Sequence, residues 1–279
     1  MTTYRKQPDL ESVAYATLDT QGLRENYLIG NLFAPGELNL VATHADRAMV
    51  GAAIPVKEPH ILDRSASSTR GGALPLREWG IINIGGSGSI NVDGEAHAMA
   101  PEDGLYIGAG DAAVTFSSDD AGNPARYYIA SYPSSGRHPT RHIAVSEIVP
   151  MALGSKETAN ERKIHKYFEP GKVATSQLVM GLTKLASGSV WNTLPPHTHD
   201  RRSEVYLYYH MPQDQAVFHF MGTPQASRHL VVRNEEAVIS PPWSMHFGCG
   251  TAPYHFIWCM GGENQDYSEM DPAPIAELK

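Results

Sequence analysis

Four residues in the second half of the chain have the types and the spacing of a metal site. His197 and His199 are separated by one residue, Glu204 follows five positions later, and His246 comes after the prolines at 241 and 242. Alternate residues of a strand project from one face, so both rings of a His-x-His tripeptide on a strand point the same way. Three imidazoles and one carboxylate suit Zn, Mn, Fe, Ni or Co. A lone histidine would usually be a solvated or core residue, so it is the complete pattern that predicts one divalent metal ion per chain.

Strands must hold these ligands. The run from Glu204 to His210 alternates, which places Glu204, Tyr206, Tyr208 and His210 on one side of a strand. The two prolines end a preceding strand and present His246 just past a turn. The ligands are therefore expected on neighbouring strands of one β-barrel.

Short strands and turn residues also fill the rest of the chain, with 25 glycines and 20 prolines that leave little room for long helices. Asp93-Gly94 between two alternating runs is a strong hairpin signal. One helix is expected near residue 20, where Asp19 or Thr20 could cap a turn that carries Leu23 and Tyr27. Residues 133–140 look like a linker. The sequence thus predicts an all-β chain of two β-barrel domains, 1–140 and 141–279, with few short helices.

Composition narrows the classes of function. The formal net charge is −8, which gives no electrostatic reason to expect nucleic acid. The first residues lack the apolar core of a signal peptide, and no apolar run approaches the roughly 20 residues of a membrane span. We expect a cytoplasmic protein, in which Cys249 and Cys259 stay reduced, although one bridge between neighbouring strands stays open.

The metal pattern resembles the two motifs of the cupin superfamily, whose domains are jelly-roll barrels, and Trp243 replaces the glycine that is usual in the second motif. The first half has no equivalent of either histidine cluster, so we expect a metal-free, structural first cupin-like domain. Longer segments are more specific. Gly80–Gly86, Trp191–Thr193 and the arginines at 201 and 202 beside the histidines resemble the 5-keto-4-deoxyuronate isomerase family over nearly the whole chain.

The resemblance implies a zinc enzyme of pectin or related polyuronate catabolism, cytoplasmic and homohexameric. It would convert the small-molecule substrate 5-keto-4-deoxyuronate into 3-deoxy-D-glycero-2,5-hexodiulosonate by aldose-ketose isomerisation, with no membrane or nucleic-acid partner. Such a reaction needs a polarised carbonyl and a proton taken from the adjacent carbon. A divalent metal ion, with zinc expected, fits the first role. An enediol route and a hydride shift both stay open.

The other catalytic residues are candidates only. Arg162 could bind the uronate carboxylate, Lys166 could be the general base if desolvated, and Glu263 could act as acid or base. The same charged stretch could be a solvated connector, and Glu263 could lie in a turn. One of the arginines at 201 and 202 could face the pocket or form a surface ion pair. A metal-dependent dioxygenase and a sugar-binding protein without turnover stay open as other classes.

Overall fold

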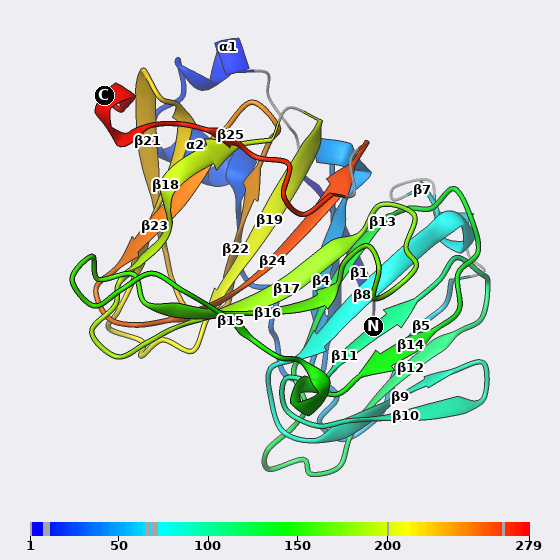
Figure 1. The fold of residues 1–279 in the computed structure, drawn as a ribbon. Coiled ribbons are helices and arrows are strands. Elements are labelled where there is room, and N and C mark those ends of the chain that lie inside the picture. Colours follow the sequence, from blue (N-terminus) through cyan, green and yellow to red (C-terminus); the bar gives the residue numbers. More distant parts are fainter. Residues whose placement is uncertain (1, 8–11, 65–66, 69–71, 200, 264–265) are drawn as a thin grey trace. The chain divides into compact units, whose positions relative to one another are not determined.

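The structure is a computed structural model (Figure 1) that describes the chain except residues 1, 8–11, 65–66, 69–71, 200 and 264–265. It divides into two compact units. The first unit combines Met1–Gln7, Asn31–Val149 and Tyr167–Val179, and the second combines Pro8–Gly30, Pro150–Lys166 and Met180–Lys279. Each unit thus contains segments from distant parts of the chain. The expected division after residue 140 stays a prediction.

The first unit is built from two main sheets. One sheet has the strand order β1 (Thr2–Gln7), β3 (Leu38–Thr43), β4 (Met49–Ala53), β13 (Tyr127–Pro133), β8 (Arg77–Asn83), β11 (Gly104–Ile107) and β14 (Arg141–Ile143). The other has the order β10 (Glu95–Met99), β9 (Gly88–Val92), β12 (Val114–Ser118) and β5 (His60–Leu62). A small pair, β6 (Ser67–Ser68) and β7 (Gly72–Ala73), completes the unit.

Apolar side chains from both sheets fill the interior of this unit. Trp79 and Leu105 come from the seven-stranded sheet, whereas Ile90 and Phe116 come from the four-stranded sheet, and all four belong to one buried core. Alternation supplies this core, because every second residue of β9 is buried. The predicted hairpin is present, since β9 and β10 pair across the turn that contains Asp93-Gly94.

The other two sheets belong mainly to the second unit. One has the order β15 (Met151–Leu153), β16 (Arg162–Phe168), β17 (Val179–Leu185), β24 (His255–Gly262), β19 (Arg202–Tyr209), β22 (Glu236–Ser240) and β2 (Leu28–Ile29). The other has the order β21 (Ala226–Val232), β20 (Val217–Thr223), β23 (Met245–Gly250), β18 (Trp191–Thr198) and β25 (Asp271–Pro272). The strand expected from Glu204 to His210 begins two residues earlier and ends at Tyr209.

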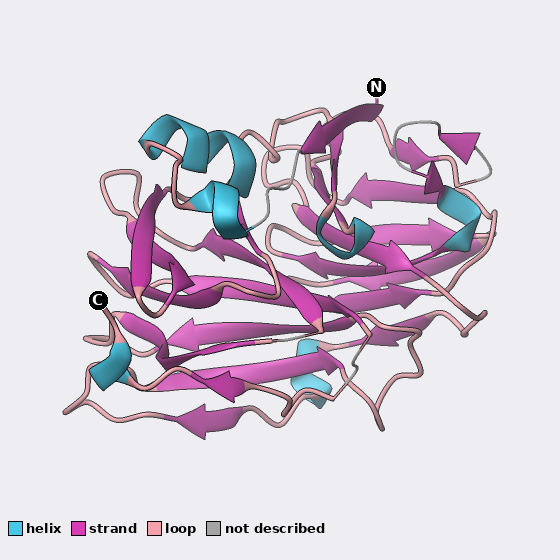
Figure 2. Ribbon diagram, turned by 90° about the horizontal axis from the view of Figure 1, so that it is seen from above, coloured by secondary structure: helices cyan, strands magenta, loops and turns pink. Residues whose placement is uncertain are grey.

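Helices are few and short, as Figure 2 shows. The α-helices are α1 (Ser12–Tyr15) and α2 (Thr20–Tyr27), and 3₁₀ helices cover Ala45–Arg47, Leu74–Leu76, Val145–Glu147 and Ile275–Glu277. The Asp19 side chain caps α2 by accepting a hydrogen bond from the backbone N–H of Gly22. The all-β prediction with few short helices is therefore confirmed. None of the described helices has the length and apolarity that a membrane span requires.

Candidate metal centre

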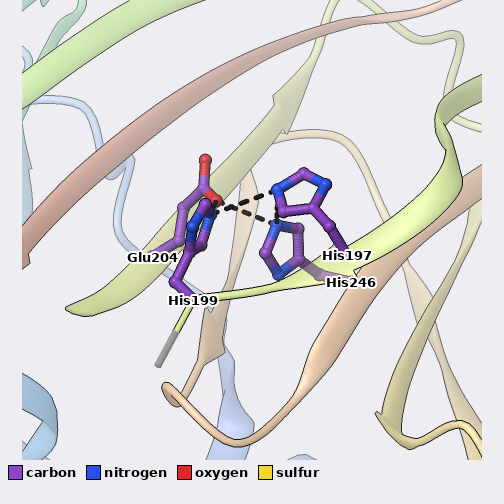
Figure 3. A group of neighbouring side chains, drawn as sticks. All are labelled: His197, His199, Glu204 and His246. Atoms are coloured by element: carbon purple, nitrogen blue, oxygen red, sulfur yellow. Dashed lines mark hydrogen bonds and ion pairs between the residues drawn. The ribbon is translucent and has the colours of Figure 1, made fainter. Parts of the chain in front are cut away.

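Three strands of the second unit bring the predicted ligands together (Figure 3). His197 on β18 lies opposite His246 on β23, so these two side chains come from neighbouring strands of the five-stranded sheet. His199 follows the end of β18 by one residue, and Glu204 lies on β19 in the other sheet. One ligand atom from each side chain lies within 4.8 Å of the others. The structure thus joins all four residues in one group between two sheets.

Four separations between candidate ligand atoms are close to those around a tetrahedral ion. The Nε2 atoms of His197 and His199 are 3.2 Å apart, and those of His197 and His246 are 3.1 Å apart. The Glu204 Oε2 atom lies 3.1 Å from Nε2 of His199 and 3.0 Å from Nε2 of His246. Ligand atoms about 2.0–2.1 Å from a tetrahedral zinc ion would be roughly 3.3 Å from one another. Neighbouring ligand atoms therefore have the spacing that a divalent ion requires, and all four lie within 4.8 Å of one another.

The outer nitrogens of two histidines set the ring tautomers. His199 Nδ1 lies 2.8 Å from the backbone oxygen of Glu269, which can only accept, so Nδ1 carries the hydrogen. The Ser240 hydroxyl donates to the backbone oxygen of Ser244 and thereby leaves a lone pair for His246 Nδ1 at 3.1 Å. Both Nε2 atoms then present lone pairs to the centre of the group, as metal ligation requires.

Burial and neighbouring groups keep His197 and Glu204 in the forms that bind metal. Desolvation, helped by the nearby imidazoles of His246 and His199, lowers the pKa of His197 to about 2. Burial alone would raise the pKa of the Glu204 carboxyl, but attraction to His246 and hydrogen bonds with His199 and His246 hold that pKa below its usual range. A neutral imidazole and an ionised carboxylate are the forms that coordinate divalent metal ions.

A cavity of about 300 Å³ adjoins the group, and three of the four ligands line it. Its polar lining includes Arg162, Thr183, Thr193 and Tyr206, and its apolar lining includes Trp258. Burial is the main cause that raises the pKa of Tyr206 well above the usual value, so this phenol stays protonated and can donate a hydrogen bond. The cavity therefore combines one cation, several hydroxyl groups and an apolar wall, as small-ligand sites do.

The three candidate catalytic residues occupy different surroundings. Arg162 lines the cavity and donates one hydrogen bond to the backbone oxygen of Asn160 at 2.9 Å. Lys166 is outside the lining, and its ammonium lies 3.9 Å from the centre of the Tyr267 ring, which does line the cavity. Glu263 is exposed and does not line the cavity. The geometry thus brings Arg162 to the site directly and Lys166 only through a neighbour.

The two arginines beside the histidines have separate roles. Arg201 is exposed and forms an ion pair with the Glu269 side chain at 2.8 Å. Arg202 is completely buried and donates to backbone oxygens of the C-terminal segment. Neither arginine lines the cavity.

Residues of the C-terminal segment also reach the site, and the sequence did not predict them. Tyr267 and Met270 line the cavity, and the oxygen of Glu269 contacts His199. No motif marks these positions, because their contribution depends on where the chain runs after β24. The departure at Trp243 also has a structural partner, since its ring packs edge-on against that of Tyr15 at 5.2 Å.

The chain is similar to known proteins over most of its length. Residues 30–274 match the KduI/IolB family. A 4-deoxy-L-threo-5-hexosulose-uronate ketol-isomerase of Formosa agariphila is 49% identical over 94% of this chain and 93% of that protein. A relative of the same name from Salmonella agona is 47% identical over 94% of this chain and 95% of that protein.

Solved structures support the fold alone. An IolB-like protein from Salmonella typhimurium LT2 superimposes with a TM-score of 0.72, at 14% identity, over 89% of this chain and 97% of that chain. The cupin-like all-β architecture is therefore confirmed. The family model and two relatives that are nearly half identical both cover almost the whole chain. Because these relatives are ketol-isomerases, the chain is an isomerase. The chain belongs to the KduI/IolB family.

Proposed function

We propose that this isomerase converts 5-keto-4-deoxyuronate into 3-deoxy-D-glycero-2,5-hexodiulosonate and needs one divalent metal ion, with zinc as the expected ion. The observation that carries the proposal is the group of four ligand atoms, all within 4.8 Å of one another, at the wall of a cavity that contains an arginine. The relatives named for this reaction match almost the whole chain. The proposed ligands are His197, His199, Glu204 and His246.

The reaction moves a carbonyl group between C1 and C2 of the substrate. A divalent ion held by three neutral imidazoles and one carboxylate would supply Lewis-acid polarisation of substrate oxygens. The Glu204 carboxylate already pairs with the imidazoles of His199 and His246 and is a proposed metal ligand, so it is a poor candidate for the general base. The phenol of Tyr206, hydrogen-bonded with Thr193, can donate to a substrate oxygen inside the cavity.

Arg162 is the proposed anchor of the substrate carboxylate. Arg162 lines the cavity, and its NH1 group donates a hydrogen bond to the backbone oxygen of Asn160. A guanidinium has five N–H donors, so this one bond does not use up its capacity to bind a carboxylate. Burial lowers its pKa, but an arginine stays charged at any pH at which the protein is folded. A planar cation with free N–H groups can bind a carboxylate in bidentate fashion and thereby set the distance from the carboxylate to C1.

The apolar wall limits water at the reacting carbons. Phe256, Trp258 and Met260 on β24 line the cavity together with Ile164 on β16. A dry wall strengthens electrostatic interactions with the substrate and protects a reactive enediol-like species. For the proton transfer we propose Lys166 over Glu263, because Lys166 contacts a ring of the wall and Glu263 does not line the cavity.

The remaining parts of the proposal rest on the resemblance. We propose that the protein acts in the cytoplasm in pectin or polyuronate catabolism and assembles as a homohexamer. The charge of −8 gives no electrostatic support for a nucleic-acid partner.

The test is an NMR time course of purified protein with 5-keto-4-deoxyuronate, alongside a sample treated with EDTA and a His199→Ala variant. A new ketone beside a terminal CH₂OH, formed only by the untreated wild type, is the expected result. Persistence of the substrate in every sample while the wild type holds metal would refute the isomerase. Oxygen uptake would then identify a dioxygenase, and uronate binding without turnover or oxygen uptake would identify a sugar-binding protein.

A further inference from the structure

A C-terminal strap, defined as residues 266–272, forms one wall of the cavity. Tyr267 and Met270 line the cavity, and the strap ends in β25, where Asp271 and Pro272 pair with Thr198 and His197 of β18. The ring of Tyr267 packs against Trp258, with 5.3 Å between ring centres. The strap therefore contacts both the cavity wall and the strand that carries a metal ligand.

Arg202 holds this strap through hydrogen bonds to its backbone oxygens. Its NH1 group donates to the backbone oxygen of Asp266 at 2.5 Å, and NH2 donates to those of Tyr267 at 3.3 Å and Glu269 at 2.9 Å. The Arg202 side chain has no exposed surface. Such a buried cation is costly to desolvate, so its three bonds to one short segment make it a specific clamp rather than a solvated surface charge.

The clamp and the metal group share one atom. The backbone oxygen of Glu269 accepts hydrogen bonds from Arg202 and from Nδ1 of His199, at 2.9 and 2.8 Å. Since Nδ1 gives its hydrogen to that oxygen, the 3.3 Å approach of the Arg202 Nε atom to the same Nδ1 is a packing contact. Fixing the carbonyl thus fixes the plane and the tautomer of the His199 ring.

We propose that Arg202 is a positioning residue, which holds the strap so that the Glu269 carbonyl orients His199 and Tyr267 closes the cavity. The inference deepens the proposed function and rests on it, because the oriented ring is a proposed metal ligand. Partners that orient a ligating histidine typically change metal affinity by 10–100-fold. Arg202 therefore acts on the metal through a main-chain carbonyl that no sequence motif marks.

The adjacent arginine provides a matched control. Arg201 also bonds residue 269, but through the half-buried carboxylate and not through the carbonyl. Arg201→Met and Arg202→Met remove the same charge one residue apart, yet only the second change frees the carbonyl. Arg202→Lys keeps a buried positive charge and is the variant expected to disturb folding less. Its single ammonium group cannot reproduce the hydrogen bonds that the two guanidinium nitrogens donate to three carbonyls.

The experiment uses Co²⁺ as the probe of the full-length protein. Cobalt affinity is measured by competition with a chelator, its visible absorption spectrum reports ligand geometry, and brief proteinase K digestion reports release of the strap. For Arg202→Met we expect a 10–100-fold loss of cobalt affinity, a changed spectrum and faster cleavage within the strap. Arg202→Lys should lie between, and Arg201→Met should stay within about twofold of the wild type.

Three results would contradict the proposal in distinguishable ways. Equal cobalt affinity and an unchanged spectrum in Arg202→Met, or in Arg202→Lys where the first variant does not fold, would refute the positioning role alone. Wild-type protein that takes up no cobalt would refute the proposed metal dependence and, with it, this role. A merely structural arginine would speed cleavage without changing the cobalt spectrum, and that outcome also contradicts the proposal.

Discussion

The carboxylate of Glu78 on β8 accepts four hydrogen bonds in the interior of the first unit. Its Oε2 atom binds the backbone N–H of Ser176 and the hydroxyl of Tyr106, and its Oε1 atom binds the backbone N–H groups of Gln177 and Leu178, all at 2.7 Å. The three backbone groups belong to the segment that leads into β17, and Thr183 of β17 lines the cavity. The isosteric change Glu78→Gln tests how much this network stabilises the protein.

The magnitude follows from the count of acceptors. An amide nitrogen cannot accept, so two of the four donors lose their acceptor whichever way the new amide turns. The less costly orientation places the amide nitrogen where Oε2 was. The Tyr106 hydroxyl can then turn and accept a hydrogen bond from that nitrogen, but the backbone N–H of Ser176 loses its acceptor. An orphaned N–H costs about 1–3 kcal/mol, and the other bonds lose their charge assistance, so we expect a loss of about 3 kcal/mol. That is roughly a hundredfold change in the unfolding equilibrium.

The assay is equilibrium urea unfolding followed by tryptophan fluorescence, at one protein concentration. Glu95→Gln is the control, because the Glu95 side chain is 77% exposed. Tyr106→Phe removes only one of the four donors and should cost about 1 kcal/mol. An unfolding midpoint for Glu78→Gln equal to that of Glu95→Gln would show that the carboxylate does not hold the segment.

Three further outcomes are expected. Arg162→Met should raise KM for the ketouronate about 10–100-fold with a smaller fall in kcat, and Arg162→Lys should recover part of the affinity, as steady-state kinetics will show; a change in kcat alone would contradict a carboxylate anchor. Burial and the neighbouring imidazole of His210 lower the pKa of His255 to about 3. Below about pH 6.5 the unfolded chain therefore binds a proton at His255, whereas the folded chain does not until the pH approaches 3. Stability should therefore fall as the pH drops from 6.5 toward 3, with a shallower slope in His255→Phe, as urea midpoints at several pH values will measure. Gly181→Ala would place a methyl group 2.1 Å from Trp258, so the indole must shift, and we expect altered tryptophan fluorescence and a raised KM, whereas unchanged values of both would contradict this packing.

Much of the fold followed from local patterns. Alternating residues mark β9 and β19, the pair Asp93-Gly94 marks a hairpin, and Asp19 marks the start of α2. These features depend on backbone geometry and on neighbours within a few residues, so they can be read from the chain. The extra residues at the start of β19 could not be predicted, because Arg202 and Ser203 pair with Gly262 and Gly261 of a distant strand.

For the site, residue types and their spacing were enough to identify the four proposed ligands and their chemistry. His197 and His199 are neighbours on one strand and its end, and their residue types already specify imidazole donors. The other groups that contact these ligands could be identified only from the folded chain. The roles of Arg202 and of the Glu269 carbonyl depend on the path of residues 266–272, and a backbone carbonyl carries no sequence signal of its own. Long-range contacts between groups that every residue possesses are set by the packing of the whole unit, and that is why they appear only in three dimensions.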